Sequence, residues 1–216
     1  RAQHKTLGGW RYQPGHESDT SVSGWQLMAM KSAQMAGLEV PEEAMARTAK
    51  WLDIAQADGG TRYAYNPYAA DTPQQRAGRS PNLAMTAEGL LMRMYLGWNR
   101  SDDRIRGGAD HLLRNLPELG SGANSTRDAY YWYYATQVMF HVGGEHWTAW
   151  NERLRPLLEK SQQQEGALAG SWSPAGQNRD RWGHAGGRHY VTTMHLLMLE
   201  VYYRHLPLFQ SGAASQ

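Results

Sequence analysis

The chain of 216 residues carries 22 basic and 20 acidic side chains, a net charge of +2, and no cysteine. A charge this close to neutral lacks the basic stripe that binds a phosphate backbone, so we expect no nucleic-acid partner. No run approaches the roughly 20 consecutive apolar residues of a membrane span, and the missing cysteines exclude disulfides, thiolate metal ligands and cysteine nucleophiles. The length allows one domain with a sizeable core.

The first predicted hairpin joins an apolar helix to an amphipathic one. Apolar residues cover most faces of residues 20–36, and Gly37 supplies a left-handed stop, which predicts a helix that other elements enclose. In residues 41–55 the apolar side chains form one stripe, and Pro41 suits the first helical turn. We expect this second helix to face water on its other side.

The same alternation of an enclosed inner helix and a one-sided outer helix continues along the chain. Further inner helices are predicted at residues 81–96, 128–142 and 188–205, with outer helices at residues 101–117 and 146–161. Pro156 is expected to kink or break the last outer helix. Residues 66–79 are predicted to form a long loop, and residues 210–216 a frayed tail.

A glycine-rich turn recurs before these helices. Gly8-Gly9-Trp10-Arg11-Tyr12 returns 51 residues later as Gly59-Gly60-Thr61-Arg62-Tyr63, and Gly170-Ser171-Trp172 follows at about twice that interval. A period of roughly 50 to 55 residues is typical of stacked helical hairpins. The sequence therefore predicts an all-α fold of repeated αα-hairpins with about seven main helices, forming a single domain over residues 1–209.

The turn Gly-Gly-Trp-x-Tyr, followed by Asp19-Thr20-Ser21 at the start of an apolar helix, resembles the repeat of the prenyltransferase and squalene-cyclase superfamily. The resemblance extends over residues 7–209. It implies an α/α-toroid or part of one, in the manner of uncharacterised bacterial members. The first residue is Arg1 rather than Met, from which we expect a signal segment or earlier repeats upstream.

The resemblance does not carry over the chemistry of the superfamily's enzymes. Its class II cyclases have the pattern D-x-D-D-T-A, whose middle aspartate protonates an alkene, and here Ser18 stands at that position within residues 16–21. Glu17 or Asp19 would replace it only if burial raised its pKa strongly. Protein prenyltransferases bind zinc through Asp, Cys and His, and this chain has no cysteine. We expect no metal and no cofactor.

Three residues are candidates for catalysis, namely Asp19, Asp128 and His184. Asp19 and Asp128 stand at the entrances of the first and third inner helices, and the resemblance implies that these helix ends surround a central cavity. The alternative is structural, because an aspartate in this position accepts backbone N–H groups as an N-cap and complements the helix dipole.

Polar reactive side chains are densest in residues 182–190. Glycines before a helix expose backbone N–H groups, so Arg188 with His184 or His189 would bind an anion or a uronate carboxylate. The alternative is a tight turn whose side chains pack on the preceding repeat. Neither His189 with His195 nor His141 with His146 has the i, i+4 spacing that directs two imidazoles to one metal.

Aromatic residues complete the predicted ligand-binding set. The chain has 9 Trp and 12 Tyr but 2 Phe, and rings with a polar tip suit a half-wet cavity wall. Such walls stabilise carbocations or stack on sugars, whereas the alternative is packing between repeats. The predicted ligand-binding residues are Trp10, Tyr12, Trp25, Tyr130, Tyr134, Trp182, Arg188 and His189.

These features predict a module that binds a ligand or a protein partner at its inner-helix face without the cyclase acid or the prenyltransferase zinc. A small-molecule ligand would be an isoprenoid or a saccharide. Two enzymatic alternatives stay open. One is a polysaccharide lyase in which Arg188 neutralises a uronate and His184, His189 or a tyrosine acts as base, and the other is a terpenoid cyclase with a displaced acid.

Overall fold

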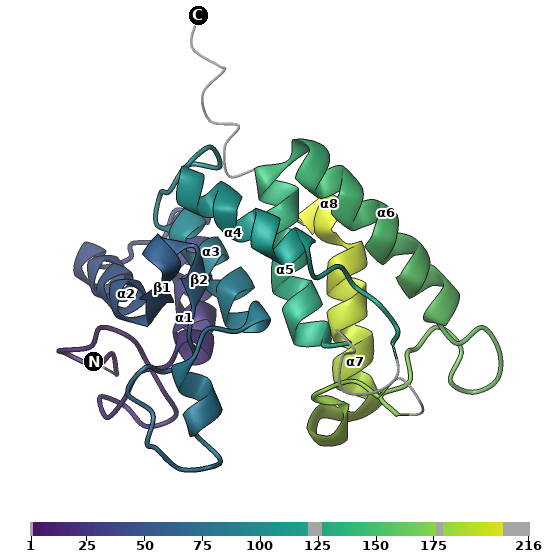
Figure 1. Ribbon diagram of the computed structural model, residues 1–216, viewed down its shortest axis with the longest axis horizontal. Helices are drawn as coiled ribbons and strands as arrows, with labels where there is room; N and C mark the ends of the chain where they lie inside the picture. The colour runs from purple at the N-terminus through teal and green to yellow at the C-terminus, as the bar shows by residue number, and fades with distance from the viewer. Residues whose placement is uncertain (1, 121–126, 176–178, 205–216) are drawn as a thin grey trace, which may run out of the picture. The chain divides into compact units, whose positions relative to one another are not determined.

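The computed structural model describes residues 2–120, 127–175 and 179–204. The chain divides into two compact units, Arg1–Gly108 and Ala109–Gln216. Helices dominate both units, and the strands of the described residues form a single two-stranded pair (Figure 1). The predicted all-α class is confirmed. The predicted tail at residues 210–216 lies outside the described residues.

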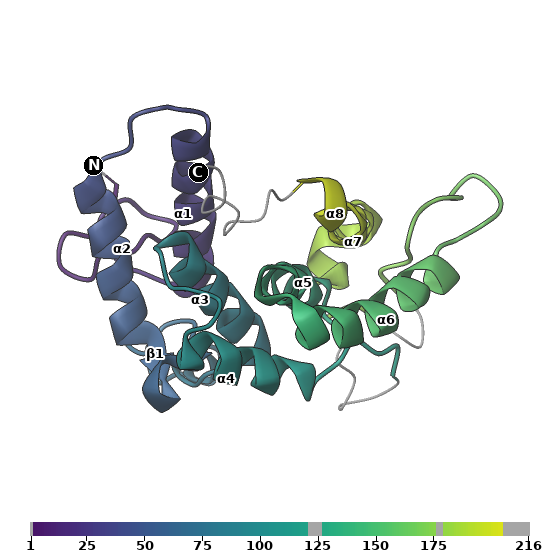
Figure 2. The ribbon, with the colours of Figure 1, turned by 90° about the horizontal axis from the view of Figure 1, so that it is seen from above.

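Unit 1 contains two long helices, then a small strand pair, and then a third long helix. Its elements are α1 (Thr20–Met35), α2 (Glu42–Ala55), β1 (Gln56–Ala57), η1 (Asp58–Gly60), β2 (Arg62–Tyr63), η2 (Arg76–Arg79) and α3 (Leu83–Tyr95). The strands are antiparallel, with Gln56 opposite Tyr63. Both α2 and α3 pack against α1, and Figure 2 shows the three helices together. Helix α4 (Asp103–Leu113) crosses the boundary between the units.

The core of unit 1 is built on α3, which is buried from Ala84 to Tyr95. Two charged residues lie on this buried helix, Glu88 and Arg93. The Arg93 guanidinium donates to Asp53 at 2.6 Å and to the Tyr63 hydroxyl at 3.1 Å. A buried charge needs such partners to remain in the core.

Helix α1 is not enclosed, which corrects the expectation from its apolar composition. Trp25 is 40% exposed and Met35 is 58% exposed. The buried residues of α1 are Thr20, Ser23, Gly24 and Leu27. Apolar side chains on every face predict enclosure only when enough neighbours are present, and α2 and α3 cover one part of this helix.

Unit 2 is built around a helix that does fit the predicted enclosed type. Its helices are α5 (Ala129–Val142), α6 (Gly144–Ser161), α7 (Gly183–Leu199) and α8 (Val201–Arg204). Helix α5 packs against both α6 and α7, and almost all of its residues are buried. Helix α6 runs through Pro156 without interruption (Figure 1), so no break occurs there.

The last predicted inner helix differs from the observed one at both ends. Helix α7 begins at Gly183 rather than at residue 188, and Gly187 interrupts its first turns with a φ of +65°. A separate short helix, α8, follows Glu200. Glycine-rich sequence is a poor helix former, which is why the early start was not predicted.

A hydrogen bond between a turn and the helix that follows it recurs at α1, α3 and α7. Backbone N–H groups of turn aromatics donate to helix hydroxyls, from Trp10 to Ser23 at 2.9 Å, from Tyr63 to Thr86 at 3.2 Å and from Trp172 to Thr192 at 3.1 Å. These bonds make Tyr63 equivalent to Trp10. The sequence motif pairs Tyr63 with Tyr12, so the predicted repeat register is two residues out.

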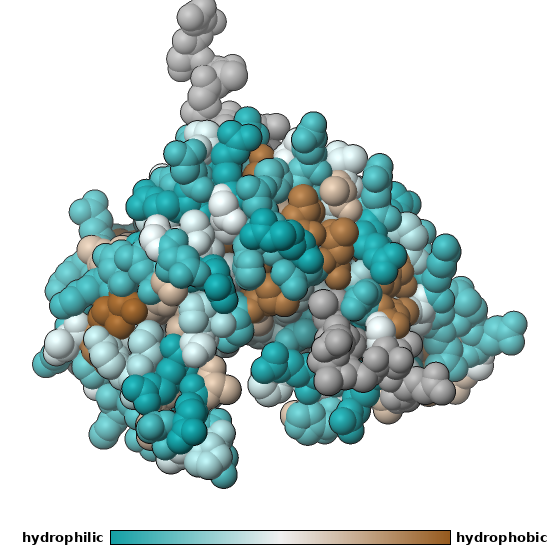
Figure 3. Space-filling model, viewed as in Figure 1, coloured by the Kyte–Doolittle hydropathy of each residue, from teal (hydrophilic) through white to brown (hydrophobic). Residues whose placement is uncertain are grey.

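Among the described residues, no helix combines the length and apolar character needed to cross a membrane. The face drawn in Figure 3 is largely hydrophilic and carries small hydrophobic patches between polar side chains.

Candidate functional site

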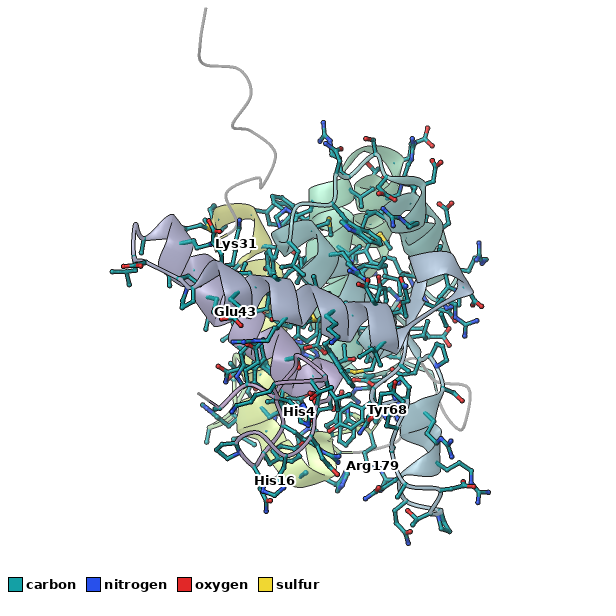
Figure 4. The ribbon with its side chains drawn as sticks, turned by 90° about the vertical axis from the view of Figure 1, so that its left-hand side faces the viewer. His4, His16, Lys31, Glu43, Tyr68 and Arg179 are labelled. Atoms are coloured by element: carbon teal, nitrogen blue, oxygen red, sulfur yellow. The ribbon has the colours of Figure 1, made fainter. Side chains whose placement is uncertain are left out.

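A pocket of about 310 Å³ opens on the segment that leads into α1. Its lining residues are Arg11, Tyr12, Gln13, His16 and Glu17. The Tyr12 residue is 79% exposed, so its ring is available at the rim. Figure 4 labels His16 on this segment, well separated from Lys31 on α1. The lining is polar and aromatic, without an aliphatic side chain.

Asp19 lies behind this pocket and is fully buried. Its Oδ1 accepts the backbone N–H of Val22 at 2.7 Å, which makes it the N-cap of α1. Its Oδ2 accepts the Tyr65 hydroxyl at 3.0 Å and lies 3.5 Å from Nε of Arg11. The cap predicted from the sequence is therefore present, and the same carboxylate also holds two side chains of the pocket region.

These contacts continue as a network around the pocket. Arg11 donates from Nη1 to Glu17. One chain of contacts therefore runs from Tyr65 through Asp19 and Arg11 to Glu17. Four side chains with fixed partners give the loop a defined shape before any ligand arrives.

Burial controls the protonation of the two central groups. Burial raises the pKa of the Asp19 carboxyl, while the hydrogen bonds from Val22 and Tyr65 and the charge of Arg11 lower it. Burial and then the Asp19 charge raise the pKa of the Tyr65 hydroxyl. Tyr65 therefore keeps its proton at neutral pH and donates it to Asp19. Because Asp19 has no exposed surface, it positions the pocket residues and does not touch a ligand.

A second cluster lies at the start of α5 in unit 2. Asp128 caps this helix, and its Oδ1 accepts the N–H groups of Tyr130 and Tyr131, both at 3.1 Å. Asp180 adds a second buried carboxylate, which accepts the N–H of Ala129 at 2.8 Å. Nη1 of Arg181 lies 3.7 Å from Oδ2 of Asp128. Two carboxylates and one guanidinium therefore surround the first turn of α5.

The cluster contains a carboxyl that titrates close to neutral pH. Burial, with a smaller contribution from the charge of Asp180, raises the pKa of Asp128 to about 6 against the lowering effects of Tyr131 and Arg181. The buried hydroxyl of Tyr190 has no hydrogen-bond partner among the described residues, and burial, then the charges of Asp180 and Asp128, raise its pKa. A carboxyl with a pKa near 6 can exchange a proton at neutral pH.

The segment predicted as the best site, residues 182–190, reaches this cluster only in part. Arg188 donates to the Ser171 hydroxyl at 2.9 Å, in the turn that precedes α7. His184 lies with Nδ1 3.2 Å from the carbonyl of Arg181, and His189 is exposed. The Arg181 guanidinium lies over the Trp182 ring, with its Cζ 5.4 Å from the ring centroid. Arg181, which was not predicted, is the residue that reaches Asp128.

The predicted aromatic residues are divided between surface and core. Tyr12 lines the pocket, and Trp25 lies exposed on α1. Tyr134 is almost fully buried and contacts the Tyr130 ring edge-on at 4.9 Å between centroids, which is the packing alternative. Trp10 takes part through its backbone in the recurring turn bond.

Sequence reasoning missed several side chains of the two clusters. Gln13 had no signal in the sequence, whereas Arg11, His16 and Glu17 lay inside the quoted motifs and were not selected. Tyr65 and Asp180 reach their helix caps from 46 and 51 residues away along the chain. In the described part of the chain, no three His, Asp or Glu side chains gather closely enough to hold a metal ion.

Comparison with known proteins leaves the chain without an assigned family. No protein-family model matches it, and no curated protein matches it. The resemblance to the prenyltransferase and squalene-cyclase repeats thus stays a prediction from the residues that carry it.

Proposed function

We propose that this chain is a helical-repeat module that binds a small hydroxylated ligand, of the saccharide class, in the pocket beside α1. The observation that carries the proposal is the pocket itself, which places an exposed tyrosine ring beside four polar side chains. An aromatic face covers the C–H face of a sugar ring, and planar polar groups hydrogen-bond to its hydroxyls.

The size and polarity of the pocket favour a saccharide over an isoprenoid. Its volume of about 310 Å³ is at the lower end of the roughly 300–1,000 Å³ typical of small-molecule sites. A long isoprenoid chain would need an apolar wall, and the lining residues offer amide, imidazole, carboxylate and guanidinium groups. Leaving those polar groups without partners against a hydrocarbon would be unfavourable.

The side chains available for a ligand follow from the network behind the pocket. Arg11 and Glu17 are held by each other, and Asp19 holds Arg11 and Tyr65. Gln13 and His16 are exposed and supply donors and acceptors at the rim. A fixed support with two adaptable polar groups is a suitable arrangement for a ring-sized polar ligand.

Titration of the intact chain with single sugars tests the proposal. Backbone amide shifts are recorded by NMR with glucose, galactose and N-acetylglucosamine as probes, and with farnesol as the isoprenoid probe. We expect a saccharide to shift residues 11–17 and farnesol to leave them unchanged. Tyr12→Ala should abolish the shifts, and the matched variant Tyr203→Ala, at another exposed tyrosine, should not. Absence of any saccharide-dependent shift would refute the proposal.

We also propose that the hairpins belong to an α/α-toroid of the prenyltransferase and squalene-cyclase superfamily. The recurring bond from a turn aromatic to a helix hydroxyl supports this, because it repeats the same local unit three times. A structure of the chain together with any neighbouring repeats tests it, and inner helices that do not share one concave side would contradict it.

A second candidate function is acid–base catalysis at Asp128, as in a polysaccharide lyase. The pKa of about 6 for this carboxyl favours it, because perturbed carboxyls concentrate at catalytic sites. Lyase action creates an unsaturated sugar that absorbs in the ultraviolet. Incubation with polygalacturonate or alginate should produce this absorbance in the intact chain and not in Asp128→Asn. If incubation with the intact chain produces no such absorbance, this second function is refuted.

A further inference from the structure

We propose that the pocket beside α1 prefers an amino sugar, whose protonated amine would contact Glu17, over a neutral sugar, and rejects a uronate. This inference rests on the proposed saccharide function and names the charge class of the ligand. It follows from which charges of the pocket are already compensated and which are still open to solvent.

The permanent positive charge of the pocket, the Arg11 guanidinium, is already paired with carboxylates. The Arg11 guanidinium donates to Glu17, lies 3.5 Å from Oδ2 of Asp19, and lies 5.9 Å from the ring centroid of Tyr65. Its side chain is 19% exposed. A uronate carboxylate that approaches Arg11 would come close to the Glu17 carboxylate on the same guanidinium, and the two negative charges would repel each other. Such a competing group selects against an anionic ligand.

The negative charge of the pocket is the accessible one. The Glu17 side chain is 60% exposed, whereas Asp19 is fully buried behind it. A ligand in the pocket therefore meets a carboxylate at the rim before it meets the guanidinium. This order holds whichever protonation state Asp19 has, because the buried group does not reach the ligand. A protonated amine would gain an ion pair with Glu17 without breaking the bond to Arg11, since a carboxylate can accept from two donors.

The exposure of Glu17 sets the size of the preference. An ion pair that is open to water is worth little, which corresponds to about a two- to five-fold gain in affinity for an amine over a hydroxyl. Repulsion of an anion by the same carboxylate is of similar size. Screening by salt should reduce both effects.

The experiment compares three sugars of the same ring size with the intact chain at pH 6.5 and low ionic strength. Dissociation constants for glucosamine, glucose and glucuronate come from NMR shifts of residues 11–17. We expect glucosamine to bind about two- to five-fold more tightly than glucose, and glucuronate to bind most weakly. Raising the ionic strength should bring the three constants together.

Two matched variants assign the preference to one carboxylate. Glu17→Gln should bring the ratio of the glucosamine and glucose constants to about one and, by releasing Arg11, improve glucuronate relative to the other two. Glu43→Gln is the control, because Glu43 is another exposed carboxylate paired with an arginine, Arg47, on α2. It should leave the ratio unchanged.

The outcomes separate this inference from the function on which it rests. Equal binding of glucosamine and glucose, or a preference that survives Glu17→Gln, overturns the inference and leaves saccharide binding in place. A preference that Glu43→Gln also removes overturns it as well, because the effect would then be one of total charge. Failure of all three sugars to bind overturns the proposed function itself.

Discussion

Replacing Asp128 by asparagine should increase the stability of unit 2 at neutral pH and leave it little changed in acid. Burial, with the charge of Asp180, raises the pKa of this carboxyl from 3.8 to about 6, so the folded chain binds the proton more tightly than the unfolded chain. The resulting stability is present below pH 3.8 and is lost as the pH rises through 6. Asparagine keeps the oxygen that caps α5 and carries no charge.

The size of the effect follows from the pKa. A rise from 3.8 to about 6 corresponds to about 3 kcal/mol over the whole titration, of which about 2 kcal/mol falls between pH 4 and pH 7.5. The Asp128 side chain is 11% exposed, so water screens this energy only weakly. The free energy of unfolding of Asp128→Asn minus that of the wild type should grow by about this amount from pH 4 to pH 7.5.

Urea unfolding at both pH values measures the difference, with hydrogen exchange of the α5 amides as the probe that reports on unit 2. Groups that titrate equally in both proteins cancel in the difference. Asp180→Asn is the linked variant, because it removes a charge that raises the Asp128 pKa and should reproduce a smaller effect of the same sign. If the stability curves of the wild type and Asp128→Asn run parallel with pH, the carboxyl is not desolvated and the reasoning fails.

Three further changes test other parts of the structure. Burial lowers the pKa of His195 from 6.5 to about 3. Up to about 5 kcal/mol of stability is therefore present above pH 6.5 and is lost as the pH falls towards 3. Urea unfolding at pH 4 and pH 7 should show that the His195→Phe variant does not undergo this loss. Gly24→Ala should destabilise unit 1 by about 1–3 kcal/mol, because its methyl group would overlap the Glu88 carboxyl; an unchanged thermal midpoint would contradict this. Thr192→Val removes the acceptor of the Trp172 N–H and should cost about 1–3 kcal/mol by calorimetry, whereas equal stability would show that another acceptor replaces it.

The sequence predicted a helix well where both of its ends carry a local capping or stop signal. Helix α1 begins after the Asp19 cap and ends just before Gly37, close to the predicted residues 20–36, because caps and left-handed glycines act within a few residues. The start of α7 was missed because Gly183 and Gly187 give no capping signal. The exposure of α1 was missed for another reason. Composition shows what a helix could bury, and neighbouring elements decide what it does bury.

In the candidate sites, too, residues close to a helix end were predicted, and partners from distant parts of the chain were not. Asp19 and Asp128 were predictable because a cap is encoded beside the helix it serves. Their partners Tyr65 and Asp180 come from distant turns, and no spacing rule connects residues that only the packing of hairpins brings together. Arg181 shows the same limit, since the residue expected to bind an anion, Arg188, bonds to the preceding turn instead.

Asp19 and Asp128 both cap a helix, but their surroundings differ. The Tyr65 hydroxyl, which donates to Asp19, is a difference that can be tested. This hydroxyl stabilises the ionised Asp19 from 3.0 Å and so lowers a pKa that burial raises. A hydrogen bond to a charged group is worth about 1.5–3 kcal/mol. Tyr65→Phe should therefore destabilise unit 1 by about that amount at pH 8, where Asp19 is ionised, and by clearly less at pH 3.5, where protonation of Asp19 proceeds. Urea unfolding with hydrogen exchange of the α1 amides measures both values. An equal loss at the two pH values would mean that the ring, and not its hydroxyl, supports the cap.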